Sequence, residues 1–537
     1  MQPPRFIVVT GGVYSGLGKG IVTASMSALL ARKHRVVNVK WDGYYNNNPG
    51  TMNPIEHGEV FVLADGTEAD LDFGHYERFT GIPSCGMQSI TRGKLNELAM
   101  RLEKEGKRYE GKTIEEIPHL RDLLIEQLTS AGEKADIITF EIGGNVGDDS
   151  ASLALHAARI LQHRFGRENV MYVHVAPMCY TIDDHEPKTR PIQRSLSELT
   201  GYGIEVDMLV VRTEAGQPLK DEQRRKISES SILPPDAIIE APSLSSVYAL
   251  PIEFLKQNVD GIIVRTLGIS VPGVSDVWMQ RVRNIIDSKG VVRVALCGKY
   301  TDVNDSYKSV KEALTHAGAS LGVRVELYLF NTERDDIESQ LAQFDAVIVP
   351  GGYGSRGIEG KIKVIKAARE QRIPYLGLCY GMQLAVVEFA RSMCGLSKAH
   401  TVEVDPATPH PVISLLPEQA GVRVRSGTQR LGEQEASLLP GSIVERLYGA
   451  VKVSERHRHR YELNPEYHDL IQRRGMLISG VHAEREDIAE FVELSEDMHP
   501  FFVATQSHPE LKSTLLRPAP LFIGLVKAAL AKMTHKA

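Results

Sequence analysis

A cysteine and a histidine that are far apart in the chain both have neighbours suited to nucleophilic catalysis. Cys379 is the central residue of Gly377–Gly381, between an apolar run at 373–378 and a helical pattern at 382–391. The apolar run predicts a buried strand, so the cysteine is expected on a sharp strand-to-helix turn, where flanking glycines let the backbone bend. A thiol at this position lies near a helix N-terminus, which favours the thiolate.

The candidate base for this thiol lies about 130 residues further on. His508 and Glu510 follow a second apolar run at 501–506, which predicts a strand running toward them. Residues two apart in an extended chain lie on one face, so we expect Glu510 to orient the His508 imidazole. The imidazole then takes the proton of the thiol, as in other cysteine nucleophile systems.

A glycine-rich turn, Pro350–Gly354, follows the apolar run at 346–349. Its backbone N–H groups and the N–H after Cys379 are candidates for the two halves of an oxyanion hole. The alternative is a buried structural cysteine with an unrelated histidine, and the order of the three motifs argues against it. Together they resemble the class I glutamine amidotransferase domain, which hydrolyses glutamine to glutamate and ammonia.

The first half of the chain carries a different kind of glycine-rich turn. An apolar run at 6–10 leads into Gly11–Gly20, which contains Lys19 and is followed by a helical pattern. Strand, glycine turn, lysine and helix form a geometry that binds phosphates through backbone N–H groups. The match to the P-loop pattern is imperfect, because the first glycine comes one place early and Gly20 replaces the usual Ser or Thr. An ordinary glycine-rich turn is the alternative.

Without that hydroxyl, a magnesium ion needs other ligands. Asp72 and Glu141 are the candidates, and Glu141 directly follows a buried run, at the edge of the sheet where ligands of α/β proteins bind. Carboxylates combined with nucleotide phosphates are the usual magnesium shell. Solvated or helix-capping acids are the alternative for both. The basic segment Lys188–Gln193 is a candidate triphosphate contact, with a solvated surface as its alternative.

Composition and length restrict the remaining possibilities. The chain has 537 residues, 42% of them hydrophobic and 24% charged, with a net charge of −6, so it predicts at least two domains and no nucleic-acid-binding surface. No apolar run approaches the roughly 20 residues that cross a bilayer, and no signal peptide is visible, so we expect a cytoplasmic protein. The five cysteines are scattered without metal or disulfide spacing, which fits a reducing compartment: Cys85, Cys179, Cys297, Cys379 and Cys394.

Apolar runs alternate with helical patterns in both halves, which predicts α/β folds with mainly parallel sheets. We expect a P-loop-like parallel-sheet synthetase domain at 1–268, a linker at 269–290, and a class I glutaminase α/β domain at 291–537. The linker carries no strong strand pattern, and a new strand is predicted from Val291.

Longer motifs identify a family. The glycine-rich turn, Pro49–Phe61, Asp70–Phe79, Glu141–Asp148 and Lys188–Pro191 resemble the synthetase domain of the CTP synthase family. The resemblance covers nearly the whole chain and continues in Gly298–Asp302, Tyr307–Val310 and Glu455–Tyr461. It implies that ATP and Mg²⁺ phosphorylate the 4-oxygen of UTP and that ammonia made at Cys379 then displaces phosphate, giving CTP. It also implies a homotetramer, in some members filaments, and GTP activation of glutamine hydrolysis.

The resemblance also implies roles for individual residues. The catalytic set is Cys379, His508 and Glu510, and the Mg²⁺ ligands are Asp72 and Glu141. The phosphate and ATP contacts are Ser15, Gly16, Leu17, Gly18, Lys19, Gly20, Lys40 and Arg212. The pyrimidine-nucleotide contacts are Ser15, Lys188, Thr189, Arg190, Gln193 and Lys226. The glutamine contacts are Gly352, Gln383, Glu403 and Arg460.

The chain departs from the family pattern mainly at positions expected to face substrates and effectors. Where the family has Lys-Leu-Asp-Pro-Tyr, this sequence has Lys40–Tyr44 with Trp41 and Gly43, followed by a polar stretch to Asn48. The other departures are Asp149-Ser150 for an Ile-Glu pair, Glu115-Glu116 for Gln-Val, a shortened segment at Thr80–Gly86, Pro242-Ser243 for Lys-Asp, and a shortened lid at Ser426–Gly432.

Three functions remain open at this stage. The first is a CTP synthase with altered regulation, in which the shortened lid puts GTP activation in doubt. The second is a paralogue that aminates another pyrimidine nucleotide, because added acid at Glu115 and Glu116 repels a triphosphate. The third is a non-catalytic scaffold that binds nucleotides, against which the complete catalytic set argues.

Overall fold

The computed structural model describes residues 3–14, 16–52, 58–109, 111–299, 306–415 and 429–536. The chain forms two compact units. One comprises Met1–Pro49 and His75–Val282, and the other comprises Gly50–Gly74 and Arg283–Ala537. The second unit therefore includes a segment from the first part of the sequence, within the predicted synthetase domain.

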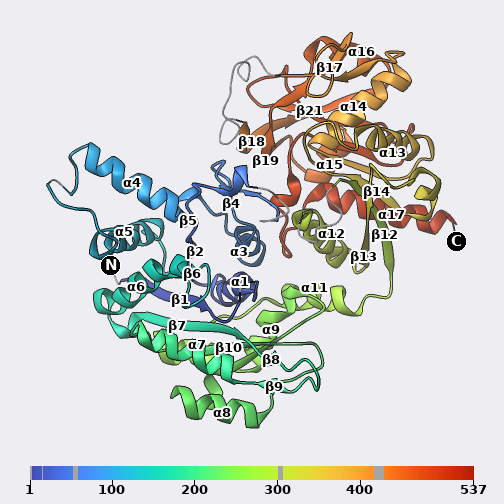
Figure 1. Ribbon diagram of the computed structural model, residues 1–537. Helices are drawn as coiled ribbons and strands as arrows, with labels where there is room; N and C mark the ends of the chain where they lie inside the picture. Colours follow the sequence, from blue (N-terminus) through green and yellow to red (C-terminus); the bar gives the residue numbers. More distant parts are fainter. Residues whose placement is uncertain are drawn as a thin grey trace. The chain divides into compact units, whose positions relative to one another are not determined.

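A seven-stranded sheet forms the centre of the first unit, with the order β11-β10-β7-β1-β6-β2-β5 and parallel pairing throughout (Figure 1). Parallel order requires a crossover between consecutive strands, and helices make most of these connections. The strands are β1 (Arg5–Gly11), β2 (Val36–Asp42), β5 (Ser89–Thr91), β6 (Ile137–Ile142), β7 (Val170–Pro177), β10 (Met208–Thr213) and β11 (Ile238–Pro242). The helices are α1 (Lys19–Leu30), α4 (Arg92–Lys104), α5 (Arg121–Ala131), α6 (Asp149–Phe165), α7 (Arg190–Gly201), α8 (Asp221–Ser231), α9 (Leu250–Lys256) and α10 (Val259–Leu267).

This sheet is covered on both faces, which explains why its strands are continuously apolar. In β1, Phe6 and Val8 pack in a core cluster with α5 and α6, whereas Ile7 and Val9 pack in a second cluster with α1, α9 and α10. Successive side chains of a strand point to opposite faces, so one strand serves both clusters. A short antiparallel pair, β8 (Cys179–Tyr180) and β9 (Pro187–Lys188), precedes α7.

The second unit contains a nine-stranded mixed sheet, in the order β13-β12-β14-β15-β23-β22-β21-β18-β19. Pairing is parallel from β13 to β23 and antiparallel from β23 to β19. Its strands are β12 (Val291–Gly298), β13 (Arg324–Asn331), β14 (Ala346–Val349), β15 (Tyr375–Leu378), β18 (Arg430–Leu438), β19 (Lys452–His459), β21 (Met476–His482), β22 (Ala489–Leu494) and β23 (Phe502–Thr505).

Helices cover both faces of the parallel part of this sheet (Figure 1). One core cluster contains side chains of α13 and α14, and another contains side chains of α12 and α17. The helices are α12 (Lys308–Leu321), α13 (Ile358–Glu370), α14 (Tyr380–Met393), α15 (Ile443–Tyr448), α16 (His468–Arg473) and α17 (Pro520–Lys536). A three-stranded sheet contains β16 (Ala399–Thr401), β17 (His410–Leu415) and β20 (Tyr461–Leu463).

Three further elements belong to the boundaries of the two units. An antiparallel hairpin pairs β3 (Phe61–Val62) with β4 (Glu68–Ala69) inside the second unit. Helix α3 (Asp72–Thr80) follows the hairpin, and helix α11 (Asp276–Asp287) lies in the segment predicted as a linker. Both sheets agree with the predicted α/β fold class.

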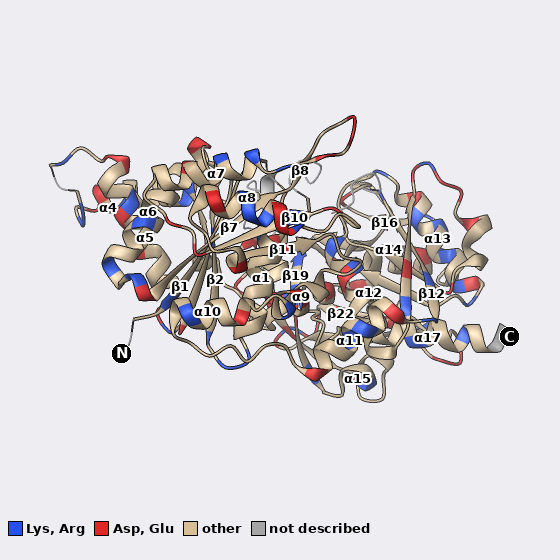
Figure 2. Ribbon diagram, turned by 90° about the horizontal axis from the view of Figure 1, so that it is seen from below, with Lys and Arg blue, Asp and Glu red and all other residues tan. Residues whose placement is uncertain are grey.

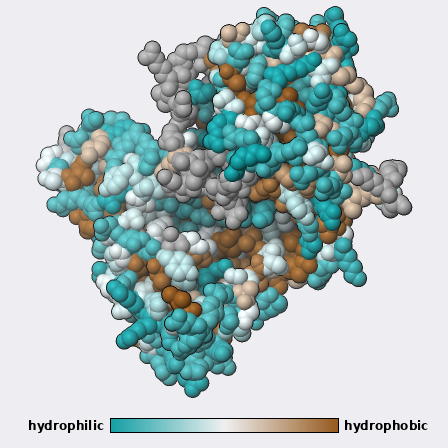
Figure 3. Space-filling model, turned by 45° about the vertical axis from the view of Figure 1, so that its right-hand side comes forward, coloured by the Kyte–Doolittle hydropathy of each residue, from teal (hydrophilic) through white to brown (hydrophobic). Residues whose placement is uncertain are grey.

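The surface matches the ordinary composition. Figure 2 shows acidic and basic residues interspersed along the helices, and Figure 3 shows hydrophilic residues over much of the face that it presents, with apolar residues in smaller groups. None of the helices in the described part of the chain is long and apolar enough to cross a membrane.

Substitution of two glycines of the second unit can measure how closely Gly432 packs against the β3–β4 hairpin. Gly432 has φ +81°, and a Cβ there would lie 2.5 Å from the backbone nitrogen of Gly66. Gly441 has φ +80° with open space around it. We expect Gly441→Ala to cost about 1 kcal/mol through its backbone conformation alone. Gly432→Ala adds a clash with the backbone of Gly66, so it should lower the melting temperature more than Gly441→Ala does. Differential scanning calorimetry of the full chain measures both, and equal shifts would contradict the packing.

Candidate active sites of the two units

Cys379 occupies the predicted elbow. Strand β15 ends at Leu378, α14 begins at Tyr380, and Cys379 between them has φ 50° and ψ −103°. A non-glycine residue in this region is strained and needs support from its surroundings. The Cys379 N–H donates to the carbonyl of Thr505 at 2.7 Å, and its carbonyl accepts the N–H of Met382 at 3.0 Å. Its side chain is buried, and the strained turn fixes the direction of the thiol.

His508 and Glu510 meet as predicted, but not by strand alternation. Strand β23 ends at Thr505, and Pro509–Leu511 form a single 3₁₀ turn. The expected extended geometry is therefore wrong, because the proline ends the strand and bends the chain. The turn still brings His508 Nδ1 to 2.7 Å from Glu510 Oε1. The carboxylate fixes the ring and leaves the other nitrogen for the thiol.

Charge at this site favours the imidazolium form. Burial opposes a charged ring, but the adjacent Glu510 and Cys379 hold the pKa of His508 well above its usual value. The N–H of His508 donates to the carbonyl of Arg456 at 2.7 Å, so the backbone of β19 also fixes this residue.

The glycine turn Pro350–Gly354 lies against the catalytic pair. A Cβ on Gly351 would be 2.8 Å from Cε1 of His508 and 3.6 Å from Cβ of Cys379, so only glycine fits there. Tyr353, in the same turn, donates its hydroxyl to the carbonyl of Arg458 at 2.7 Å. That same carbonyl lies 3.8 Å from Sγ of Cys379. The turn is therefore in place to present backbone N–H groups to a substrate bound at the thiol.

Two of the predicted glutamine contacts lie at this turn: Gly352 is part of it, and Glu403 is bonded to it. Glu403 accepts the N–H of Gly354 at 2.8 Å. Gln383 donates to the carbonyl of Tyr461 at 2.8 Å and to the side chain of Gln506 at 3.1 Å. A Cβ on Gly352 would lie 3.6 Å from Nζ of Lys361. Arg460 directly precedes Tyr461, at the end of β19.

The sequence analysis missed three residues of this site: Gln506, Lys361 and Arg458. Gln506 donates to Sγ of Cys379 at 3.6 Å. Lys361 is 1% exposed, and burial lowers its pKa to about 8. Its position on the apolar face of α13, between Ile358 and Ile365, was a helical-spacing signal for a buried lysine. Arg458 carried no such signal, because its contacts are distant in sequence.

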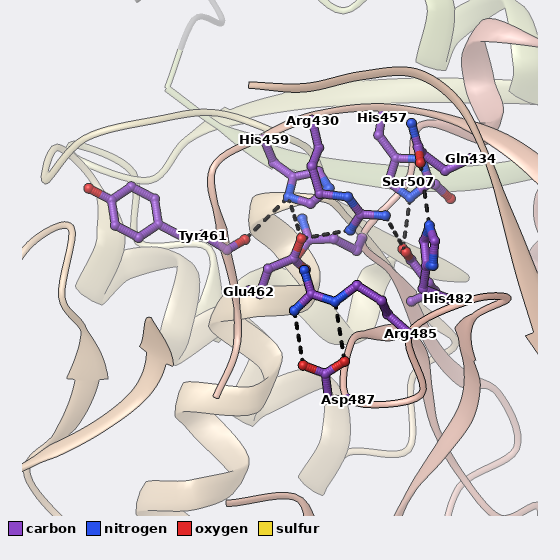
Figure 4. Close-up of polar contacts among 12 residues, drawn as sticks. Arg430, Gln434, His457, His459, Tyr461, Glu462, His482, Arg485, Asp487 and Ser507 are labelled. Carbon is purple, nitrogen blue, oxygen red and sulfur yellow. Dashed lines mark hydrogen bonds and ion pairs between the residues drawn. The ribbon is translucent and has the colours of Figure 1, made fainter. Parts of the chain in front are cut away.

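A buried polar network surrounds Arg430 and includes His457 and His459 of β19 (Figure 4). Arg430 donates to Glu462 and to Glu490, each at 2.7 Å, and His457 contacts Glu490 at 2.7 Å. His459 lies 3.3 Å from Glu462. Burial opposes charge on Glu490, but His457 and Arg430 hold its pKa below the usual value. The network fixes β19, whose backbone contacts both catalytic residues.

In the first unit, the described part of the glycine-rich turn contains two glycines with a left-handed backbone. Gly16 and Gly18 have φ of +77° and +83°, and Gly18 caps α1. Lys19 donates to the carbonyl of Gly144 at 2.7 Å, at the end of the strand that carries Glu141. Arg212 lies beside Gly18, with Nε 3.8 Å from the position of a Cβ there. Leu17 is buried and Gly20 is in the first turn of α1, while Ser15 lies outside the described residues.

The candidate magnesium ligand Glu141 is buried at the carboxyl end of β6. It is the register partner of Lys40 in β2, and Tyr76 donates to its carboxylate at 2.5 Å. Asp72 is the first residue of α3, the helix that carries Tyr76 one turn later. Within the described ranges, no group of three or more histidines, cysteines and acids is arranged to hold a metal ion by itself.

A hollow of about 880 Å³ contains part of the predicted pyrimidine set. Arg190 and Gln193 line it, opposite the loop at 145–148. Gln193 donates to the carbonyl of Lys226 at 3.1 Å, which places these two predicted contacts together. Thr189 precedes the first turn of α7. Lys188 is exposed and pairs with Glu186 at 2.5 Å, and its contact with a pyrimidine nucleotide stays a prediction.

Several departures from the family pattern contact one another. The Trp41 side chain is buried and donates to the carbonyl of Ser150 at 3.0 Å. A Cβ on Gly43 would lie 2.3 Å from the same carbonyl, so a proline at this position would clash. Glu116 forms an ion pair with Arg92. Residues 426–428 of the shortened lid lie outside the described residues.

A glycine-rich turn followed by Lys19 in one unit, and Cys379 with the His508–Glu510 pair in the other, are the features expected of a glutamine-dependent ligase. The family model described as CTP synthase N-terminus matches residues 5–269, and the model for glutamine amidotransferase class I matches residues 302–528. The chain belongs to the CTP synthase family. A CTP synthase of Methanopyrus kandleri is 44% identical over 98% of this chain and 99% of the relative. One of Sulfurisphaera tokodaii is 45% identical, with 98% and 99% covered.

Among solved structures, the glutaminase domain of Trypanosoma brucei CTPS with bound acivicin matches with 34% identity and a TM-score of 0.42. The match covers 45% of this chain and 94% of that chain.

A buried acid near the catalytic set yields a pH prediction. Glu455 accepts a hydrogen bond from Tyr448 at 2.8 Å, and burial raises its pKa to about 7. The folded protein therefore favours the protonated acid, and the stability of the wild type falls as pH rises from about 4.5 through about 7. Glu455→Gln removes this loss, so we expect a gain of roughly 3 kcal/mol above pH 7.5 and little gain at pH 5.

Calorimetry of both proteins across this pH range measures the effect. Glu496→Gln, at an exposed ion pair with Arg446, is the control and should show no such dependence. A gain for Glu455→Gln that is equal at pH 5 and pH 8 would contradict a titrating Glu455.

Proposed function

We propose that this enzyme aminates the 4-position of UTP to give CTP, with ATP as the phosphoryl donor and glutamine as the source of ammonia. The carrying observation is the strained, buried Cys379 beside the His508–Glu510 pair, in a chain that matches CTP synthases over nearly its full length. The cysteine centre supplies ammonia, and the glycine-rich turn of the first unit handles the nucleotide phosphates.

The geometry supports a thioester route for glutamine. The Cys379 thiolate attacks the amide carbon, and N–H groups at the glycine turn and after Cys379 stabilise the oxyanion. His508 then gives its proton to the departing nitrogen, and ammonia leaves. His508 next takes a proton from water, which attacks the thioester and releases glutamate. Glu510 holds the ring in position through both steps.

The synthetase chemistry solves a leaving-group problem. The 4-oxygen of uracil is a poor leaving group until ATP phosphorylates it, after which ammonia displaces phosphate. We assign Lys19 and Lys40 to the charge that develops on the transferred phosphoryl group. Mg²⁺, held by Asp72 and Glu141 with the ATP phosphates, would supply further charge neutralisation. Arg190 and Gln193, which line the hollow, are assigned to the pyrimidine nucleotide.

The paralogue with a different nucleotide substrate is not favoured. Arg92 forms an ion pair with Glu116, which reduces the repulsion between this acid and a nucleoside triphosphate. Trp41, Gly43 and Ser150 form one packed set, so these departures repack the protein beneath the site together. Agreement with CTP synthases over 98% of the chain includes both halves of the reaction. A scaffold without catalysis does not account for the intact cysteine centre.

The oligomeric state and the location are also proposed from membership of the family. We assign a homotetramer, with filament formation as a further property, and a cytoplasmic location. GTP activation of glutamine hydrolysis is tested separately, because the lid that serves it in the family is shortened here.

The decisive experiment is a product assay. Purified protein is incubated with ATP, Mg²⁺, ammonium and UTP, with UDP and UMP in parallel, and the products are separated by chromatography. We expect efficient conversion of UTP to CTP, with UDP and UMP at least tenfold poorer because they lack phosphates for the basic contacts. Preferred amination of UMP or UDP would overturn the assignment of UTP.

Replacement of the nucleophile separates the two reactions. Cys379→Ala should abolish CTP formation from glutamine, with a loss of at least about 10³-fold, because no other group can form the thioester. CTP formation from ammonium should stay within about twofold of wild type. Steady-state assays with each nitrogen donor measure this, and a parallel loss of both activities would count against two separate sites.

A further inference from the structure

The β3–β4 hairpin comes from the first part of the sequence, but it contacts β19, the strand whose backbone touches Cys379 and His508. Four contacts fix the segment at 59–68 in the second unit. Glu59 accepts the N–H of Ser309 at 3.0 Å, and the carbonyl of Val62 accepts a hydrogen bond from Arg456 at 3.0 Å. The carbonyl of Ala64 accepts the N–H of Glu433 at 2.9 Å, and Glu68 pairs with Arg458 at 2.8 Å.

Both arginines in this set also touch the catalytic residues through their backbones. The carbonyl of Arg456 accepts the N–H of His508 at 2.7 Å. The carbonyl of Arg458 lies 3.8 Å from Sγ of Cys379 and accepts the hydroxyl of Tyr353 at 2.7 Å. Successive side chains of β19 point to opposite faces of the strand. Arg456 and Arg458 share the face that contacts the hairpin, and His457 and His459 share the face that contacts the buried network.

Of the four contacts, the Glu68–Arg458 pair joins two oppositely charged side chains. The Glu68 side chain is 2% exposed and that of Arg458 is 21% exposed, so water screens the pair weakly. Arg458 Nε donates to Oε1 of Glu68 at 2.9 Å, and Nη2 lies 2.8 Å from the same oxygen, so the contact is a charge-assisted hydrogen bond. Its guanidinium also lies 5.6 Å from the centre of the Tyr353 ring, in the glycine turn. A change at Glu68 therefore reaches both Cys379 and the oxyanion turn through one residue.

We propose that Glu68 is a positioning residue of the glutaminase and that the β3–β4 hairpin is a structural part of the glutaminase site. Glu68 holds the Arg458 side chain, and the Arg458 backbone holds the Cys379 thiol and the Tyr353 hydroxyl. The glutaminase matched by the family model at 302–528 is incomplete without this hairpin. The inference rests on the proposed glutaminase activity and extends it to a residue that touches no substrate.

The test compares Glu68→Gln with the wild type in the full-length enzyme. Gln is isosteric but uncharged, so it leaves the Arg458 guanidinium without its buried counter-charge. We expect glutaminase kcat/KM to fall by about 10- to 100-fold, mainly in kcat, because a small displacement of catalytic groups has effects of this size. The rate of Cys379 alkylation by iodoacetamide should change in parallel, since it reports the thiol without glutamine. Ammonium-dependent CTP formation should stay within about threefold.

Two further variants make the result specific. Glu496→Gln breaks the exposed Arg446–Glu496 pair, which also joins an acid to an arginine at 2.7 Å, and should leave every readout unchanged. Arg458→Gln should reproduce the glutaminase loss, and the double variant Glu68→Gln/Arg458→Gln should lose no more than the larger single loss, because the two residues act as one unit.

The possible outcomes distinguish the positioning role of Glu68 from the proposed glutaminase activity itself. Unchanged glutaminase and alkylation in Glu68→Gln would overturn the positioning role. Equal losses of glutaminase and ammonium-dependent synthesis would also overturn it, since they indicate general destabilisation. Losses that multiply in the double variant would separate Glu68 from Arg458. A wild-type protein without glutaminase activity would instead overturn the proposed function itself.

Discussion

The strained backbone at Cys379 is the constraint around which the second unit is organised. A positive φ at a residue with a side chain is unfavourable, so neighbouring structure must hold it. Parallel pairing of β15 with β23 does this, because it places the carbonyl of Thr505 where it accepts the Cys379 N–H. The same pairing brings the chain after β23 beside the thiol, so the support of the nucleophile and the delivery of His508 come from one strand contact.

Strand β19 then links the catalytic pair to two different kinds of support. On one face, buried histidines and acids around Arg430 hold the strand with charged hydrogen bonds. On the other face, two arginines reach the β3–β4 hairpin. Buried charges are stable only when they are paired, so each pair demands a partner at a defined place. The backbone between these faces, which contacts Cys379 and His508, is therefore closely defined.

The nucleotide half shows how a family pattern can change without loss of its catalytic groups. Trp41 is larger than the leucine of the family pattern, and Gly43 is smaller than its proline. Both contact the backbone of Ser150, so the extra volume at one position is accommodated by the smaller residues. Lys40, on the same strand as Trp41, keeps its register beside Glu141. Three departures from the family pattern, Trp41, Gly43 and Ser150, therefore lie against one another.

The sequence alone determined the class of fold, and it predicted the turn at Cys379 and the contact of His508 with Glu510. These features depend on local patterns: continuous apolar strands, glycines around Cys379, and His508 two residues from Glu510. It was wrong about the backbone at His508, where a 3₁₀ turn at Pro509–Leu511 replaces the expected extended strand. It also gave no sign that Arg92 pairs with Glu116, because the two residues lie on different elements. Only tertiary structure placed Arg458 between Cys379 and Glu68, residues separated by about 310 positions, since no local pattern encodes which distant acid a buried arginine will meet.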